Sequence, residues 1–341
     1  MFTNLTDVTT WNESDLMKYM EFLKHIELGQ EITLIFIAIL TTLGNSVVLV
    51  ATCREKDLHQ PNKYFIAFLA VADLFVGMFL APLKVYQLNL GSEVRRNLSI
   101  HLCRFMVWID TFALATSILT LAFISFDRYL KIRKPLQYKA RMTTSRSLKI
   151  IVTILLVSTA FASFAASPYS GSYGIVLMNS NLKYCAGDKS KEKVFYTFLS
   201  VAFILSTVII LVMYTLVFVV AHKRQIMLRN GQLGQTWNGQ NQRSVFRQDL
   251  KVIRMLFVVL GVFILCWFPF VIFNLLELYD PSSIDWDSTS LNYQYSIHIS
   301  RTIVGMLPLL NSLCNPIIYA CLDRKYREAF NSLFQRIICR P

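Results

Sequence analysis

Seven separate stretches of this chain are each long and apolar enough to cross a lipid bilayer as a single helix. They cover residues 32–53, 63–86, 104–126, 148–168, 194–221, 252–278 and 297–321. A helix that crosses the hydrocarbon core needs about 20 mostly apolar residues, and in lipid its backbone N–H and C=O groups must be paired internally. Only 16% of the residues are charged. The sequence therefore predicts an all-α membrane protein, a seven-transmembrane helix bundle.

Charged residues set the expected orientation of the bundle. Lysine and arginine are concentrated in segments 54–63, 131–149, 223–254 and 322–341, which fall on one side of the spans. Short loops rich in these residues stay in the cytoplasm, so we expect the N-terminus outside and the C-terminus inside, in the plasma membrane. The net charge of +13 then reflects this asymmetry and anionic lipid rather than nucleic acid, because the basic residues adjoin the spans.

Three domain segments follow from these assignments. Residues 1–31 are expected to form an extracellular tail, residues 32–321 the bundle, and residues 322–341 a cytoplasmic helix and tail. Apolar residues recur at helical spacing at Tyr326, Phe330, Leu333, Phe334 and Ile337. This pattern predicts a short amphipathic C-terminal helix on the membrane surface, with a disordered tail as the alternative. Cys339 follows it and is a candidate for palmitoylation.

Covalent features are expected on the outer side. Asn4, Asn12 and Asn97 each begin an N-x-S/T sequence, the acceptor for glycosylation, and all three fall outside the membrane. Cys103 lies just outside the third span, and Cys185 lies in the loop after the fourth. Because disulfides persist in an oxidising exterior, we predict a Cys103–Cys185 bridge. No basic stretch with a cleavable apolar segment opens the chain, so the first span is expected to act as the targeting signal.

Five short motifs occur in order along the spans. They are Gly44-Asn45, Leu69-Ala70-Val71-Ala72-Asp73, Asp127-Arg128-Tyr129, Cys266-Trp267-Phe268-Pro269 and Asn315-Pro316-Ile317-Ile318-Tyr319. In these motifs the chain resembles the rhodopsin-like class of G-protein-coupled receptors, over about residues 30–336. The resemblance implies a receptor rather than an enzyme, which binds an extracellular ligand and activates a heterotrimeric G protein. Ser158 and Ser206 depart from the usual tryptophan and proline, and the missing proline should straighten the fifth helix.

The resemblance also implies a switch at the cytoplasmic side. Arg128 would pair with Asp127 and reach Asp249, forming a latch that opens when the sixth span swings outward. Ordinary charge at a membrane edge is the alternative. The residues that the resemblance assigns to the switch and to G-protein coupling are Asp127, Arg128, Tyr129, Tyr214, Asp249, Phe263, Asn315, Pro316 and Tyr319.

A carboxylate at mid-membrane depth needs a partner. Asp73 in the second span would cost at least about 2.5–3.5 kcal/mol to insert without one. Ser117, Asn311 and Ser312 match the positions at which the family binds an allosteric sodium ion, and oxygen ligands suit such a hard cation. A protonated Asp73 in a hydrogen-bond network is the alternative. We expect no other cofactor.

Asp110 is the residue most informative about the ligand. It lies seven residues after Cys103, hence about 10 Å deeper along the same helix. In receptors resembling this chain, an aspartate here binds a protonated amine, and nearby aromatic rings favour ammonium groups. The predicted ligand-binding residues are Asp110, Thr111, Leu114, Phe198, Ala202, Trp267, Phe270, Asn274, Gly305 and Leu309.

Several alternatives to an amine receptor remain open or are excluded. Asp110 could instead pair internally with Arg104 or Arg301, and the ligand could be a peptide or a nucleoside. A catechol is disfavoured, because the fifth span carries apolar residues where catechol receptors place serines. Retinal chemistry is excluded, because residues 294–322 contain no lysine. A transporter would usually show internal repeats, which we do not detect.

Overall fold

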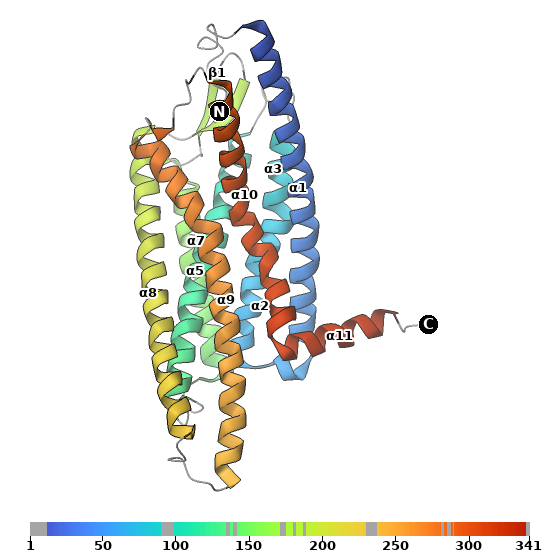
Figure 1. The fold of residues 1–341 in the computed structure, drawn as a ribbon, viewed down its shortest axis with the longest axis vertical. Helices are drawn as coiled ribbons and strands as arrows, with labels where there is room; N and C mark the ends of the chain where they lie inside the picture. The colour runs from blue at the N-terminus through green and yellow to red at the C-terminus, as the bar shows by residue number, and fades with distance from the viewer. Residues whose placement is uncertain are drawn as a thin grey trace.

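The computed structural model describes residues 12–89, 99–133, 137–138, 142–170, 175–179, 182–186, 189–229, 237–280, 283–284, 288 and 290–338, with side chains left out at 62, 175–192, 224, 228–229, 237–249 and 337–338. The chain forms a bundle of seven long helical spans (Figure 1). These spans are α1 (Glu13–Arg54), α2 (Pro61–Phe75) continued by α3 (Ala81–Leu88), α5 (Ile100–Arg133), α7 (Thr144–Ala165), α8 (Lys189–Arg229), α9 (Trp237–Tyr279) and α10 (Leu291–Leu322). A 3₁₀ turn, η2 (Lys56–Leu58), joins α1 to α2. The predicted seven-helix fold is confirmed, and the chain is a multi-pass membrane protein.

The spans pack as a closed ring with one helix near its centre. Helix α5 contacts α2, α7, α8 and α9, while α10 closes the ring between α1 and α9. The outer surface of the bundle remains apolar, as at Leu156, Phe218 and Leu265, which are 64%, 65% and 71% exposed. Large exposed apolar surfaces of this kind are stable in contact with lipid. The aromatic residues Phe263 and Trp267 instead lie in the buried core.

Helix α1 begins well before the predicted apolar span at residue 32. The side chain of Asn12 accepts a hydrogen bond from the Asp15 backbone N–H at 2.7 Å and so caps the helix. Further along, Phe22 packs on Tyr295 of α10 with 4.2 Å between ring centroids. The first two turns include the charged residues Glu13, Asp15 and Lys18, so capping and contact with α10 hold this extension rather than lipid. Part of the expected tail is therefore helical.

Two glycines allow neighbouring spans to approach closely. A Cβ atom added at Gly44 of α1 would lie 3.0 Å from the ring of Pro316 in α10. One added at Gly77 would lie 2.8 Å from the hydroxyl of Thr42 in α1. Larger side chains at either position would force the helices apart. The Gly44-Asn45 motif thus has a packing reason, since it brings α1 against the Asn315-Pro316 segment.

The second span contains a π-helical turn, η3 (Val76–Leu80), between α2 and α3. The backbone N–H of Ala81 bonds to the carbonyl of Val76, five residues earlier. Each residue of a helix rotates the chain by about 100°, so this wider turn resets which side chains face inward beyond it. Lys84 of α3 thereby comes to line the interior of the bundle.

A two-stranded hairpin that we did not predict lies between α7 and α8. Strand β1 (Ile175–Asn179) pairs antiparallel with β2 (Leu182–Ala186), and Val176 lies opposite Cys185. The hairpin covers one end of the bundle, and α11 (Arg324–Ile338) leaves the other (Figure 1). We call these the hairpin end and the α11 end.

Helix α11 is amphipathic, as predicted from the sequence. Tyr326, Phe330 and Leu333 are buried against the bundle, while Phe334 is 57% exposed on another face. The helix turns away from the bundle axis (Figure 1). An apolar residue in such a position is suited to the membrane surface.

Candidate ligand cavity and switch

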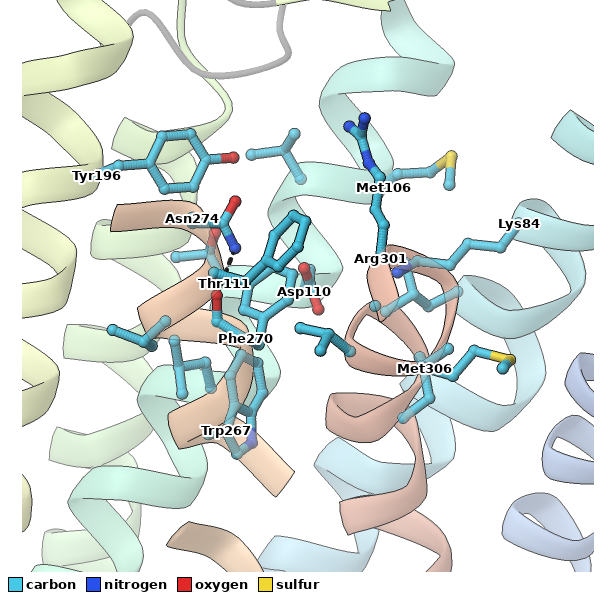
Figure 2. Close-up of a pocket in the computed structure, with 18 of the residues that line it drawn as sticks. Lys84, Met106, Asp110, Thr111, Tyr196, Trp267, Phe270, Asn274, Arg301 and Met306 are labelled. Atoms are coloured by element: carbon cyan, nitrogen blue, oxygen red, sulfur yellow. Dashed lines mark hydrogen bonds between the residues drawn. The ribbon is translucent and has the colours of Figure 1, made fainter. Parts of the chain in front are cut away.

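Near the hairpin end, six helices enclose a cavity of about 470 Å³. Sites for small molecules commonly have volumes of about 300–1,000 Å³. The residues of the predicted ligand site that line this cavity are Asp110, Thr111, Leu114, Trp267, Phe270, Asn274, Gly305 and Leu309. Figure 2 shows several of these side chains converging from α5 and α9.

Asp110 projects into the middle of the cavity from α5 (Figure 2). Its carboxylate makes no hydrogen bond or ion pair with any described residue. The expected internal partner Arg301 lies 3.9 Å from Glu277 instead, measured from Nη1 to Oε1. Lys84 acts on Asp110 electrostatically without forming an ion pair. The carboxylate is therefore available to a ligand.

Aromatic rings of α9 form one wall beside Asp110. The rings of Trp267 and Phe270 meet edge to face at 6.1 Å, and Phe263 lies 6.3 Å below Trp267. Asn274 donates its side-chain N–H to the carbonyl of Phe270 at 2.6 Å, which fixes the orientation of the amide. The indole N–H of Trp267 is buried and has no hydrogen-bond partner among the described residues. Because Trp267 lines the cavity, a molecule bound there would contact its ring directly.

Two of the residues predicted for the ligand site, both on α8, do not line the cavity. Phe198 is 57% exposed and Ala202 does not line the cavity. The inward face consists of Phe195, Tyr196, Leu199, Ser200 and Phe203. Because successive helical residues point about 100° apart, Phe198 and Ala202 fall outside that stripe. Helix α8 contains no proline that would shift its register.

Two ionisable residues of the cavity were not predicted, and a third was assigned another role. Lys84 of α3 and Glu277 of α9 line it together with Arg301 of α10. Lys84 had a signal in the sequence, because an ionisable residue within an apolar span marks a functional site by default. Glu277 and Arg301 lie near span ends, where charge is common, and only their contact reveals the pair.

A buried polar cluster surrounds Asp73 deeper in the bundle. Asn315 donates a hydrogen bond to the Asp73 carboxylate at 2.8 Å, and Ser312 makes a second contact. Asn45 donates to the carbonyls of Thr41 and Ser312, but its own side-chain oxygen has no partner among the described residues. Ser117 and Asn311, predicted with Asp73, are each 4% exposed.

At the α11 end, Arg128 and Asp127 form an ion pair. Nη2 of Arg128 lies 2.5 Å from Oδ2 of Asp127, and both side chains are almost fully buried. The hydroxyl of Tyr138 donates to the other carboxylate oxygen at 2.8 Å. The hydroxyl of Tyr129, in contrast, accepts a hydrogen bond from the exposed Arg133 at 2.6 Å. Asp249 lies outside the described side chains, so its contact with Arg128 stays a prediction.

The two tyrosines predicted to move together are both buried. Tyr214 of α8 and Tyr319 of α10 are each 2% exposed. The ring of Tyr319 lies 5.7 Å from that of Tyr326 in α11. The hydroxyl of Tyr214 makes no hydrogen bond of regular geometry with a described residue. It lies within electrostatic reach of Arg128.

Of the residues predicted to carry covalent modifications or a disulfide, the structure describes the side chains of Cys103 and Asn12. Cys103 is disulfide-bonded. The side chain of its predicted partner, Cys185, lies outside the described residues, as do Asn4, Asn97 and Cys339. Asn12 is exposed, and its side-chain oxygen caps α1. Glycosylation and palmitoylation stay predictions.

Comparison with known proteins agrees with this architecture. The sequence model of the 7 transmembrane receptor (rhodopsin family) matches residues 44–319. Trace amine-associated receptor 5 of Mus musculus is 27% identical over 304 residues, covering 89% of this chain and 84% of that receptor. Adenosine receptor A2b of Bos taurus is 26% identical over 318 residues, covering 89% of each. The 5-hydroxytryptamine receptor 7 of Xenopus laevis is 28% identical over 340 residues, covering 89% of this chain and 76% of that receptor.

The family match includes residues of all seven spans that the structure describes; it omits α1 before Gly44 and the last three residues of α10. The five motifs found in the sequence lie within the matched residues, and the structure brings three of them together around Asp73, Asn45 and Asn315. The chain belongs to the rhodopsin family of seven-transmembrane receptors.

Proposed function

We propose that this chain is a plasma-membrane receptor for a small protonated amine and that it activates a heterotrimeric G protein. The observation that carries the amine is the unpaired carboxylate of Asp110 inside the cavity. A partly buried carboxylate without a partner gains most from a cationic ligand, because hydrogen bonds between charged groups contribute about 1.5–3 kcal/mol. Relatives named as trace amine and 5-hydroxytryptamine receptors support the same ligand class.

The aromatic wall supports an amine that carries a ring. Trp267 and Phe270 lie beside Asp110, and their faces attract ammonium groups. A ligand held at Asp110 by its ammonium would therefore place an apolar or aromatic portion against α9. The inward face of α8 carries the hydroxyls of Tyr196 and Ser200 beside three apolar side chains, so it can also accept a polar substituent on that ring.

A nucleoside is the second candidate. Relatives named as adenosine receptor A2b match the chain about as well as the amine receptors. Asn274 lines the cavity and offers an amide to a polar ring. A neutral nucleoside would, however, leave Asp110 unpaired, so Asp110 is the residue that discriminates between the two ligands.

The proposed switch runs from the cavity to the α11 end through α9. A ligand that contacts Trp267 would repack it against Phe263, to which it is already adjacent. The α11 end of α9 would then move outward, carry Asp249 away from Arg128 and so release Arg128 for the G protein. The ligand shifts this equilibrium only by the difference between its affinities for the two states.

Arg128 and the neighbouring loops would supply the contact with the G protein. Residues 131–147 and 222–250 join spans at the α11 end and are rich in lysine and arginine. This charge supports a cytoplasmic position for the α11 end and an extracellular position for the hairpin end. A disulfide at Cys103 near the hairpin end supports the same orientation.

We also propose that the cluster around Asp73 holds a sodium ion. Its residues fit, because the carboxylate, the hydroxyls of Ser117 and Ser312 and the amide of Asn311 all offer oxygen. The side-chain oxygen of the buried Asn45, which has no partner among the described residues, is a further oxygen ligand in the same region. When bound, the ion would supply the positive charge that the buried carboxylate lacks.

The amine is tested by replacing Asp110 with asparagine. We expect potency for an arylalkylamine agonist to fall by about 10–100-fold, the loss of one charge-assisted hydrogen bond. The measurement is agonist-driven nucleotide exchange on a G protein in membranes, with surface expression followed in parallel. Asp15→Asn is the control, because Asp15 pairs with Lys18 away from the cavity.

The same experiment separates the alternatives. An unchanged response to the amine in Asp110→Asn would show that the amine does not bind at Asp110. A response to adenosine that is unaffected by Asp110→Asn would favour the nucleoside. Orientation is checked separately, by antibody access to a tag placed at the N-terminus of intact cells.

A further inference from the structure

The cavity carries both signs of charge at separate places. Lys84 enters it from α3, and its ammonium makes no hydrogen bond or ion pair with any described residue. Asp110 on α5 is likewise unpaired, although Lys84 acts on it electrostatically. Two opposite charges that face one cavity without pairing leave a site for a molecule that lies between them.

The three chemical regions of the cavity lie in sequence across Figure 2. Trp267 and Phe270 lie on one side, Lys84 extends from the opposite side, and Asp110 lies between them. A molecule that follows this order would present a ring to α9, a cation to Asp110 and an anion to Lys84.

The end of the cavity near Lys84 is rich in N–H groups. Gln87 lies one helical turn from Lys84 on α3, while Gln30 of α1 and Arg301 of α10 also line the cavity, the latter paired with Glu277. Amide and ammonium N–H groups together can satisfy several lone pairs of one carboxylate. An amine without an anionic group would leave this end of the cavity unused.

Charge balance favours the same occupant. Among the described residues that line the cavity, the charged side chains are two acids, Asp110 and Glu277, and two bases, Lys84 and Arg301. Their formal charges cancel, so a plain monocation gains at Asp110 but is repelled by Lys84. A zwitterion meets an opposite charge at both places.

We propose that the ligand is a small aromatic zwitterion of the amino-acid type. Its ammonium binds Asp110, its carboxylate binds Lys84, and its ring packs on Trp267 and Phe270. This inference rests on the proposed amine at Asp110 and adds Lys84 as the residue that selects a carboxylate. In an α-amino acid, both charged groups are attached to one carbon and lie close together, which suits two side chains that act on each other electrostatically across the cavity.

The test compares pairs of probes that differ only by a carboxylate. Phenylalanine with phenethylamine, and tryptophan with tryptamine, are titrated into the full-length chain in lipid nanodiscs, and binding is measured by calorimetry and ligand-detected NMR. We expect the amino acid of at least one pair to bind about tenfold or more tightly than its amine, as one charge-assisted hydrogen bond predicts.

Variants of Lys84 identify the residue responsible. Lys84→Met should abolish the preference for the amino acid and strengthen binding of the amine a few-fold, because it removes the repulsion. Lys84→Arg should retain the preference. Lys149→Met is the matched control, because Lys149 is exposed on α7 away from the cavity.

The outcomes separate this inference from the proposed function. Suppose that amine binding depends on Asp110 but the ligand's carboxylate does not increase affinity, or that Lys84→Met leaves the preference for the amino acid unchanged. Either result would contradict the zwitterion proposal and leave the amine proposal in place. If Asp110→Asn leaves amines and amino acids bound as before, both proposals fail. Failure of every amino acid to bind at millimolar concentration also overturns the zwitterion.

Discussion

Lys63 of α2 and Asp323, the residue before α11, form an ion pair in which both side chains are buried, 3% and 5% exposed. The other carboxylate oxygen of Asp323 accepts the backbone N–H of Lys325 at 3.0 Å and so caps α11. The ammonium of Lys63 also lies 4.6 Å from the centroid of the Tyr326 ring. This arrangement fastens α11 to the bundle where the Asn315–Tyr319 motif ends.

We expect Asp323→Ala to lower the free energy of unfolding by about 3–5 kcal/mol, because it leaves Lys63 buried without a partner. The double variant Lys63→Met/Asp323→Leu should recover most of this loss, since it removes both charges. Thermal unfolding in detergent measures the effect. Glu328→Ala is the control, because its pair with Arg324 is exposed and such pairs contribute little. Equal effects of Asp323→Ala and Glu328→Ala would contradict the prediction.

Tyr326 predicts how stability depends on alkaline pH. Burial is the main cause that raises the pKa of its hydroxyl above the usual value. Below about pH 10 the tyrosine is protonated in both the folded and the unfolded state, so it causes no pH dependence. Above that pH the unfolded state loses its proton first, and stability falls. We expect the free energy of unfolding to fall more steeply with pH for the native chain than for Tyr326→Phe. Equal pH dependence of unfolding in the two would contradict this prediction.

The sequence predicts the seven spans well, because lipid requires long apolar helices and little else is compatible with it. It does not predict where those helices begin. The first turns of α1 include several charged residues and are held by the Asn12 cap and by Phe22 packing against Tyr295. The π-helical turn of the second span was not predicted either; it contains Gly77, which lies close to Thr42 of α1.

Most of the cavity could also be predicted, since Asp110, Trp267 and Phe270 occupy positions that the family resemblance specifies. The rest depends on helix rotation and on contacts between spans. Phe198 does not line the cavity, because the inward face of α8 is set by a helix rotation that the sequence does not show. The pairing of Glu277 with Arg301 joins two helices and has no local signal.

We expect Gly77→Ala to destabilise the bundle, although alanine is the better helix former. The added Cβ would lie 2.8 Å from the Thr42 hydroxyl, and such overpacking costs about 1–3 kcal/mol. Gly261→Ala is the matched control, because nothing lies within 4 Å of its added Cβ. It should be neutral or stabilising by up to about 1 kcal/mol. Melting temperatures that shift alike in both variants would argue against close contact at Gly77.

Tyr138 tests whether the Asp127–Arg128 pair restrains the receptor. Its hydroxyl bonds Asp127 at 2.8 Å, so Tyr138→Phe removes one hydrogen bond from a carboxylate that holds Arg128. A loss of about 1.5 kcal/mol from the closed state would raise the open population roughly tenfold. We expect higher nucleotide exchange without agonist at equal surface expression. Tyr169→Phe, at an 83% exposed residue, serves as the control. Unchanged basal nucleotide exchange in Tyr138→Phe would show that this hydrogen bond does not stabilise the closed state.

The register of α8 can be tested with two adjacent residues of similar character. Leu199 lines the cavity, whereas Phe198 points to the outside of the bundle and is 57% exposed. Leu199→Trp adds bulk inside a cavity of about 470 Å³ and should weaken binding of any arylalkylamine or aromatic amino acid that binds the native chain, by about tenfold or more. Phe198→Trp exchanges one aromatic ring for another on the lipid side and should leave affinity unchanged. Both are measured by calorimetry in nanodiscs. If Phe198→Trp weakened binding and Leu199→Trp did not, the inward face of α8 would be the one first predicted from the sequence.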